Sequence, residues 1–180
     1  IDPPNIPHDY NPVGSYIKYF TIPKDWEGSP VYISFQGVES AFYLWINGHF
    51  VGYSEDTFTP AEFEITDFLE EGENKVAVEV YKWCSGSWLE DQDFWRLSGI
   101  FRDVYLYTVP RAHIRDMFIT TDLDREYKMA TIENTLELIS YDETRAKVSF
   151  ELCDAQGDIV ANSEEVVVGD DETRLTAQVS

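Results

Sequence analysis

The chain has 180 residues with 34 acidic and 13 basic side chains, so its formal net charge is −21 at pH 7. Nucleic acids and anionic membrane surfaces are bound through clusters of Lys and Arg, and no window of this sequence holds one, which excludes both partner classes. With 43% hydrophobic and 15% aromatic residues the chain can bury enough surface to fold. It has no apolar run of about 18 residues to span a membrane, and it is too short for a (β/α)8 barrel of about 250 residues.

Short apolar runs with a period of two fill the first 110 residues. They predict strands at residues 16–20, 31–35, 42–46, 49–53, 63–66, 75–83 and 104–107. The clearest local signal is Asn47-Gly48 between two of these runs, because a type I′ hairpin turn requires positive φ at both central residues. Seven or eight strands with no helix between them predict an antiparallel β-sandwich of jelly-roll type.

The composition changes near Pro110. All five Trp lie before it, and only four aromatic residues follow it. We therefore predict two domains, a jelly roll at residues 1–110 and an immunoglobulin-like β-sandwich at residues 111–180. Alternating apolar and polar residues at 129–138, 145–152 and 159–161 indicate strands and support the immunoglobulin-like assignment.

The second domain is short for its class. An immunoglobulin-like domain needs about 100 residues, and only 70 follow Pro110, so we expect five or six strands and a truncated sandwich. The chain also opens at Ile1 rather than Met, which favours a processed protein or a piece of a longer one.

The cysteines and histidines predict no metal site. Cys84 and Cys153 are far apart and form no Cys-x-x-Cys pair, so two buried thiols are the simpler interpretation. His8, His49 and His113 are equally scattered, which favours solvated histidines.

A long connection at residues 83–102 is rich in Trp, carboxylates and Arg, whereas passive loops favour small polar residues. Sugars suit this mixture, because their C–H faces stack on aromatic rings and their hydroxyls bind carboxylates and Arg. The candidate stacking rings are Trp88, Phe94 and Trp95. In the alternative interpretation these rings belong to the core, and Arg96 and Arg102 pair with neighbouring carboxylates.

Three carboxylates of this connection, Glu90, Asp91 and Asp93, lie within four residues. A glycosidase needs two carboxylates about 5 Å apart for retention, or roughly 6.5–9.5 Å apart for inversion. Acids this close in one loop point in different directions, and nothing nearby would raise the pKa of just one, so we assign no catalytic residue to this chain. Their spacing also lacks the alternation of an EF-hand calcium loop.

Four segments of the first domain carry a resemblance to a known family; they are residues 37–48, 51–56, 62–66 and 90–104. The last reads Glu-Asp-Gln-Asp-Phe-Trp-Arg-Leu-Ser-Gly-Ile-Phe-Arg-Asp-Val. Together they closely resemble the sugar-binding domain of the β-galactosidases of glycoside hydrolase family 2, and Glu-Asp-Gln-Asp is typical of that branch over β-glucuronidases and β-mannosidases. Residues 111–180 resemble, by pattern and position, the immunoglobulin-like domain that follows it.

The resemblance implies an intact enzyme that hydrolyses terminal β-D-galactosyl residues, as in lactose, with retention. A catalytic barrel of the same polypeptide would supply both catalytic glutamates, so we expect this fragment to be non-catalytic alone. The resemblance also implies that the full-length enzyme is a homo-oligomer. The alternatives are a freestanding carbohydrate-binding module and a purely structural pair of β domains.

By position, Asp93 matches the family residue that enters the barrel's active site. The resemblance implies that Asp93 contacts the galactosyl hydroxyls of the substrate and helps to ligate a sodium ion. One carboxylate cannot hold sodium alone, so we expect no tightly bound cofactor on the fragment. The magnesium ligands of the intact enzyme would lie outside this chain. The sequence departs from its relatives at Cys84-Ser85, where they often have Ser-Asp, so a metal contact by that Asp is in doubt.

Overall fold

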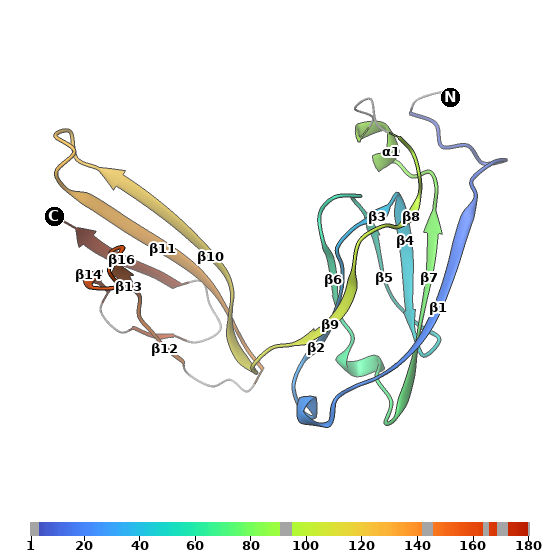
Figure 1. Ribbon diagram of the computed structural model, residues 1–180, viewed down its shortest axis with the longest axis horizontal. Coiled ribbons are helices and arrows are strands. Elements are labelled where there is room, and N and C mark those ends of the chain that lie inside the picture. The colour runs from blue at the N-terminus through green and yellow to red at the C-terminus, as the bar shows by residue number, and fades with distance from the viewer. Residues whose placement is uncertain (1–3, 91–94, 142–145, 164–165, 169–172, 180) are drawn as a thin grey trace. The chain divides into compact units, whose positions relative to one another are not determined.

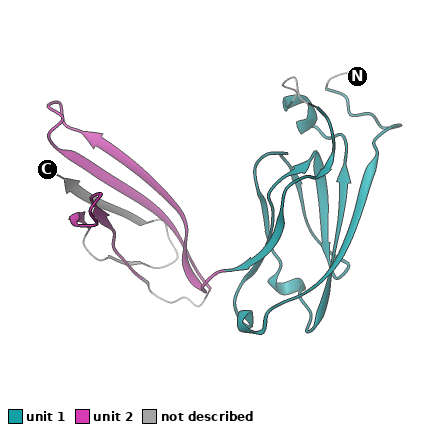
Figure 2. Cartoon of the chain, in the orientation of Figure 1, with its two compact units in different colours: residues 1–108 teal, residues 109–180 magenta. Residues whose placement is uncertain are grey.

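The computed structural model describes residues 4–90, 95–141, 146–163, 166–168 and 173–179. It divides into two compact units, Ile1–Thr108 and Val109–Ser180 (Figure 2). Across the described residues, helix is limited to one turn of α-helix, α1 (Gly86–Leu89), and two 3-10 turns, η1 (Lys24–Trp26) and η2 (Thr66–Phe68). In these residues no helix is long and apolar enough to cross a membrane. The predicted all-β fold class is therefore confirmed.

The first unit is a sandwich of antiparallel sheets (Figure 1). Its larger sheet contains, in spatial order, β1 (Val13–Thr21), β7 (Glu73–Tyr81), β4 (Ala41–Ile46) and β5 (His49–Glu55). The second sheet contains β6 (Ala61–Glu64), β2 (Val31–Phe35) and β9 (Val104–Thr108). A short ladder joins β3 (Val38–Glu39) to β8 (Gly99–Ile100).

The core of this unit lies between the two sheets, where alternate side chains of facing strands meet. It is a cluster of buried apolar residues, Val31, Ile33, Phe35, Val38, Phe42, Leu44, Ile46, Ile65, Val78 and Val80. Phe35 and Phe42 pack with ring centroids 4.7 Å apart. Burial of this cluster stabilises the sandwich by roughly 1.5–3 kcal/mol for each large side chain.

The predicted hairpin at Asn47-Gly48 is confirmed. Both residues have positive φ, 51° and 85°, and Ile46 pairs with His49 across the turn. The Asn47 side chain also accepts a 2.8 Å hydrogen bond from the Lys75 backbone and donates a 2.8 Å bond to the fully buried Asn74. The turn is thereby tied to strand β7.

The first unit differs from the prediction in several strand bounds and in two short strands. The strand expected at residues 63–66 ends at Glu64, because the Thr66 hydroxyl accepts a hydrogen bond from the Val31 backbone and Thr66 opens η2. Strands β3 and β8 were not predicted, since two residues are too few to show a period.

The described strands of the second unit form three antiparallel groups. The largest sheet has the order β10 (Ala112–Leu123), β11 (Ala130–Ser140) and β16 (Thr173–Val179). The two pairs are β12 (Ala146–Val148) with β15 (Val166–Val168), and β13 (Glu151–Cys153) with β14 (Ile159–Asn162).

This unit differs from the sequence prediction in strand number. Its described part holds seven strands rather than five or six, because the strand expected at 145–152 is divided into β12 and β13. Between them, the Phe150 backbone forms 3.0 Å hydrogen bonds with the hydroxyl and the backbone N–H of Ser163. Strand β10 was not predicted, because nearly all of its side chains are exposed and no buried face imposes a period of two.

Candidate functional site

The connection after β7 is the candidate site, and the structure shows how the sandwich holds it. Its first part is α1, and its last part leads through residues 95–98 into β8. Asp91, Asp93 and Phe94 lie outside the described residues, so the predicted role of Asp93 stays a prediction. The described residues on either side show what fixes the two ends.

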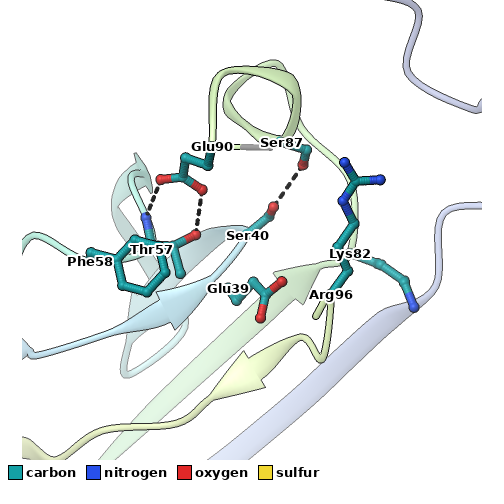
Figure 3. A pocket seen from close by; sticks show the side chains of 8 residues that line it. All are labelled: Glu39, Ser40, Thr57, Phe58, Lys82, Ser87, Glu90 and Arg96. Atoms are coloured by element: carbon teal, nitrogen blue, oxygen red, sulfur yellow. Dashed lines mark hydrogen bonds between the residues drawn. The ribbon is translucent and has the colours of Figure 1, made fainter. Parts of the chain in front are cut away.

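Glu90 anchors the first end. Its Oε1 accepts a 2.8 Å hydrogen bond from the Thr57 backbone N–H, and its Oε2 accepts a 2.6 Å bond from the Thr57 hydroxyl (Figure 3). Thr57 is only 2% exposed, so this two-point contact is made at the edge of the core. Hydrogen bonds to a charged group contribute about 1.5–3 kcal/mol, and Glu90 is therefore a structural anchor rather than a free acid.

The single turn of α1 is held by buried hydroxyls. Ser87 and Ser40 hydroxyl oxygens lie 2.7 Å apart, and the Cys84 backbone N–H donates to the Ser87 hydroxyl at 3.0 Å. Cys84 itself is buried, as predicted, whereas Cys153 is exposed. A helix this short is not stable alone, so these tertiary contacts determine its position.

Glu55 holds the start of the same turn. Its carboxylate accepts hydrogen bonds from the Ser85 hydroxyl at 2.6 Å, the Gly86 backbone at 2.9 Å and the Tyr53 hydroxyl at 2.6 Å. Burial opposes ionisation of Glu55, but these three donors outweigh burial and lower its pKa. Ser85 thus serves as a donor to Glu55.

Arg96 fixes the second end of the connection. Its guanidinium carbon lies 5.1 Å from the centroid of the Trp83 ring and 5.3 Å from that of Trp88. The two Trp rings stack at 5.6 Å with an interplanar angle of 19°. Trp88 is therefore committed to this internal stack, which argues against its use as a sugar platform.

Arg102 takes a backbone role. It donates to the carbonyl oxygens of Gln36 at 3.2 Å and Phe58 at 3.0 Å, and it lies over the Phe58 and Phe101 rings. In the alternative interpretation its partner was a neighbouring carboxylate, whereas the structure pairs it with these two backbone carbonyls. Arg102 thereby joins the connection to the loop before β6.

The residues flanking 91–94 expose large apolar side chains. Leu89 is 83% exposed, Trp95 is 81% exposed and Leu97 is 75% exposed. The alternative that Trp95 belongs to the core is therefore wrong. Exposed apolar side chains gathered on one loop are typical of a surface that contacts another molecule or domain.

A cleft beneath the connection is too small for a sugar. Its volume is about 20 Å³, which is near the space needed by one water molecule. Figure 3 shows its lining, which consists of Glu39, Ser40, Thr57, Phe58, Lys82, Ser87, Glu90 and Arg96. The cleft therefore serves to anchor the connection.

Glu39 is the perturbed acid of this cleft. Burial raises the pKa of its carboxyl, and the nearby Glu90 charge adds to that rise, while the Leu97 backbone and the charges of Lys82 and Arg96 oppose it. Its Oε2 accepts a 3.1 Å hydrogen bond from the Ser98 backbone. Glu39 thus joins β3 to the returning end of the connection.

The described residues do not form a candidate metal site. Within residues 4–90, 95–141 and the later described segments, no three His, Cys, Asp or Glu side chains gather as a metal site would require. Asp93, the predicted sodium ligand, stands outside these ranges.

The sequence reasoning missed a larger groove on the outer face of the four-stranded sheet. Its volume is about 390 Å³, and its lining includes Tyr43, Trp45, Tyr53, Tyr81 and Trp83. Tyr43 and Trp45 of β4 could have indicated this groove, because they alternate with the core residues of that strand and are aromatic.

Comparison with known proteins gives one family for the first unit. The model of the glycosyl hydrolases family 2 sugar binding domain matches residues 1–110. A β-galactosidase of Halalkalibacterium halodurans is 59% identical over 162 residues, 90% of this chain and 16% of that protein. A β-galactosidase of Clostridium acetobutylicum is 56% identical over 171 residues, 95% of this chain and 19% of that protein. The chain thus spans less than a fifth of these curated relatives.

Solved structures extend the likeness over both units. A β-glycosidase from Bacteroides vulgatus has a TM-score of 0.75 and 28% identity, covering 93% of this chain and 21% of that one. A β-glucuronidase from Bacteroides uniformis has a TM-score of 0.79 at 22% identity, covering 95% of this chain and 22% of its own, which supports the fold alone.

Proposed function

This chain belongs to glycosyl hydrolase family 2, and we propose that it is the N-terminal part of a β-galactosidase that hydrolyses terminal β-D-galactosyl residues with retention. Its relatives in Halalkalibacterium halodurans and Clostridium acetobutylicum carry that name, and each is more than five times as long as the segment it shares with this chain. In the proposal, a catalytic barrel of the same polypeptide supplies both catalytic glutamates. The part described above supplies scaffolding and one contact with the substrate.

The observation that carries this proposal is the construction of the connection between β7 and β8. On one side Glu90 is hydrogen-bonded to Thr57, and on the other the Ser98 backbone is hydrogen-bonded to Glu39 of β3. Between these anchors Leu89, Trp95 and Leu97 expose their apolar side chains. A loop with fixed ends and an apolar exposed surface suits docking against a second domain. Docking there would carry the intervening carboxylates to that domain's surface.

Asp93 is the proposed contact residue of this loop. Its carboxylate would accept hydrogen bonds from galactosyl hydroxyls, which donate well to an anion. Its neighbour Glu90 uses both oxygens on Thr57, which leaves Glu90 poorly suited to hold a ligand. The hard oxygens of Asp93 also fit sodium, which when bound would supply positive charge beside the sugar hydroxyls. The remaining sodium ligands, and those of magnesium, would come from outside this chain.

The isolated chain should therefore be inactive. In the proposal both catalytic glutamates of glycoside hydrolysis belong to the barrel, so this chain holds no pair of catalytic carboxylates. The proposal also assigns the homo-oligomeric state to the full-length enzyme. Sustained turnover of a chromogenic β-galactoside by the purified 180-residue chain would contradict it.

The test of Asp93 uses the intact β-galactosidase that contains this chain. Asp93→Ala should raise KM about tenfold or more, because a hydrogen bond to a charged group contributes about 1.5–3 kcal/mol. Its dependence on sodium concentration should also weaken. Asp25→Ala removes an exposed carboxylate of η1 and serves as the matched control. Unchanged KM and sodium dependence in Asp93→Ala would overturn the assignment.

A further inference from the structure

The outer face of the sheet β1-β7-β4-β5 carries aromatic rings where a solvated sheet face normally carries polar residues. On β4, Phe42, Leu44 and Ile46 point into the core and are at most 2% exposed. Tyr43 and Trp45 alternate with them and therefore point outward. Such an arrangement is unusual for a face exposed to water.

Tyr43 is the centre of an aromatic platform on this face. The strand register places it opposite Tyr53 of β5 and Glu79 of β7. Its ring centroid lies 4.7 Å from that of Tyr53, 5.7 Å from that of Tyr81 and 6.0 Å from that of Trp45. Tyr43 is 36% exposed and Tyr53 is 40% exposed, so the rings are accessible as well as packed.

Two carboxylates lie at the edge of the platform, and both border the groove. Glu55 accepts a 2.6 Å hydrogen bond from the Tyr53 hydroxyl, and Glu79 accepts a 3.3 Å bond from the Tyr81 hydroxyl. Burial raises the pKa of Tyr53, and its hydrogen bond to the Glu55 carboxylate adds to that rise. Glu55 uses both of its oxygens on Tyr53, Ser85 and Gly86. The edge therefore carries negative charge from both carboxylates, and Glu79 is the acceptor that it offers to a ligand.

We propose that this groove binds the ring of a neutral pyranoside. A pyranose is a disc whose C–H face covers an aromatic platform, while an outward hydroxyl donates to the Glu79 carboxylate at the edge. The volume of about 390 Å³ falls in the range of small-molecule sites. The inference uses only residues of this chain, so it stands or fails independently of the proposed catalytic role.

The charge and shape of the groove select among ligands. The Glu55 and Glu79 carboxylates repel a uronic acid, because its carboxylate carries the same negative charge. A bare cation is bound best when rings enclose it, whereas Tyr43 and Trp45 lie side by side, with an interplanar angle of 33°. A neutral sugar fits both features.

The experiment is saturation-transfer NMR on the 180-residue chain with methyl β-D-galactopyranoside as the probe. Saturable binding in the millimolar range is expected, as for a single ring on an exposed platform. Tyr43→Ala should weaken binding about fivefold or more, and Tyr43→Leu should do the same while keeping an apolar side chain on β4. Tyr19→Ala is the matched control, since Tyr19 is 58% exposed on β1 of the same sheet and lies outside the groove.

A charged probe sharpens the test. Methyl β-D-glucuronide should bind more weakly than the neutral galactoside, and Glu79→Gln should narrow that difference. Absence of saturable binding to the folded chain would overturn the proposal and leave the face as a docking surface for protein. Equal affinity in both Tyr43 variants and the parent chain would also overturn it. So would tighter binding of the glucuronide, or of free lysine as a cationic probe, than of the neutral galactoside.

Discussion

The two units share a period of two, but the side chains whose burial the structure describes, at residues 4–90, 95–141 and 147–163, differ in how far they are buried. Of the 13 buried hydrophobic side chains in these ranges, 12 lie in the first unit and Leu136 alone lies in the second. Strand β10 of the second unit exposes Ile114, Met117, Phe118 and Ile119. Alternation along a strand therefore builds a core only where a second sheet covers the apolar face.

The largest effect should come from the core of the first unit. Leu44→Ala removes a side chain that is 0% exposed and should lower the free energy of unfolding by about 2–5 kcal/mol. Ile119→Ala, at 52% exposure in the second unit, should change it by about 0.5 kcal/mol or less. Urea unfolding followed by Trp fluorescence measures the first unit selectively, because all five Trp lie there, and circular dichroism follows both units. Equal losses for the two variants would contradict the contrast.

A smaller effect should come from the anchor of the connection. Thr57→Val removes the hydroxyl that donates to Glu90 and should cost about 1–3 kcal/mol, because the charged acceptor loses a partner near the core. Thr120→Val, on the exposed strand β10, is the matched control and should be nearly neutral. The unfolding midpoint followed by the fluorescence of Trp83 and Trp88 should be lower in Thr57→Val than in the parent chain, because both Trp residues lie in the connection that Glu90 anchors. Indistinguishable unfolding midpoints would show that Glu90 is not an anchor.

The smallest effects should be opposite pH dependences of the free energy of unfolding for two carboxylates of the first unit, Glu39 and Glu55. The raised pKa of Glu39 means that the folded state binds its proton more tightly, so its contribution is present at low pH and lost as pH rises through the folded pKa. Glu39→Gln should therefore stabilise the chain at neutral pH, with the gain vanishing below about pH 4.3.

Glu55 should show the opposite dependence. Its lowered pKa gives stability above the ordinary glutamate value of about 4.3, and this stability is lost as pH falls through the folded pKa. Glu55→Gln should destabilise the chain at neutral pH and converge with the parent in acid. Chemical unfolding between about pH 3 and pH 7 tests both variants. Parallel pH profiles for the two would refute the assigned causes.

Local patterns predicted those parts of the fold whose geometry is set by neighbouring residues. The turn at Asn47-Gly48 was predictable because its backbone conformation depends on those two residues. The division between β12 and β13 was not, because Phe150 is held by Ser163, 13 residues away. Strand β10 escaped prediction because its alternate residues meet no core.

The candidate site divides in the same way. The composition of residues 83–102 marked the connection as unusual, and the run from 90 to 104 carried the family resemblance. The partners of its side chains could not be predicted, because Glu90 binds Thr57 across 33 residues and Ser85 binds Glu55 across 30. Trp88 was offered as a sugar platform, but it stacks on Trp83 beneath Arg96.

The sequence by itself determined the all-β class, the Asn47-Gly48 hairpin and the family, because backbone propensity, burial period and a long motif are recorded locally along the chain. Only the tertiary structure decided which carboxylates serve as anchors and which rings stay accessible. Those properties arise when distant strands pair, as when the register of β4 with β5 and β7 brings Tyr43 beside Tyr53 and Glu79. Strand pairing of that kind depends on how the whole core packs. The period of two along a strand does not record it, because that period is the same whichever strand lies opposite.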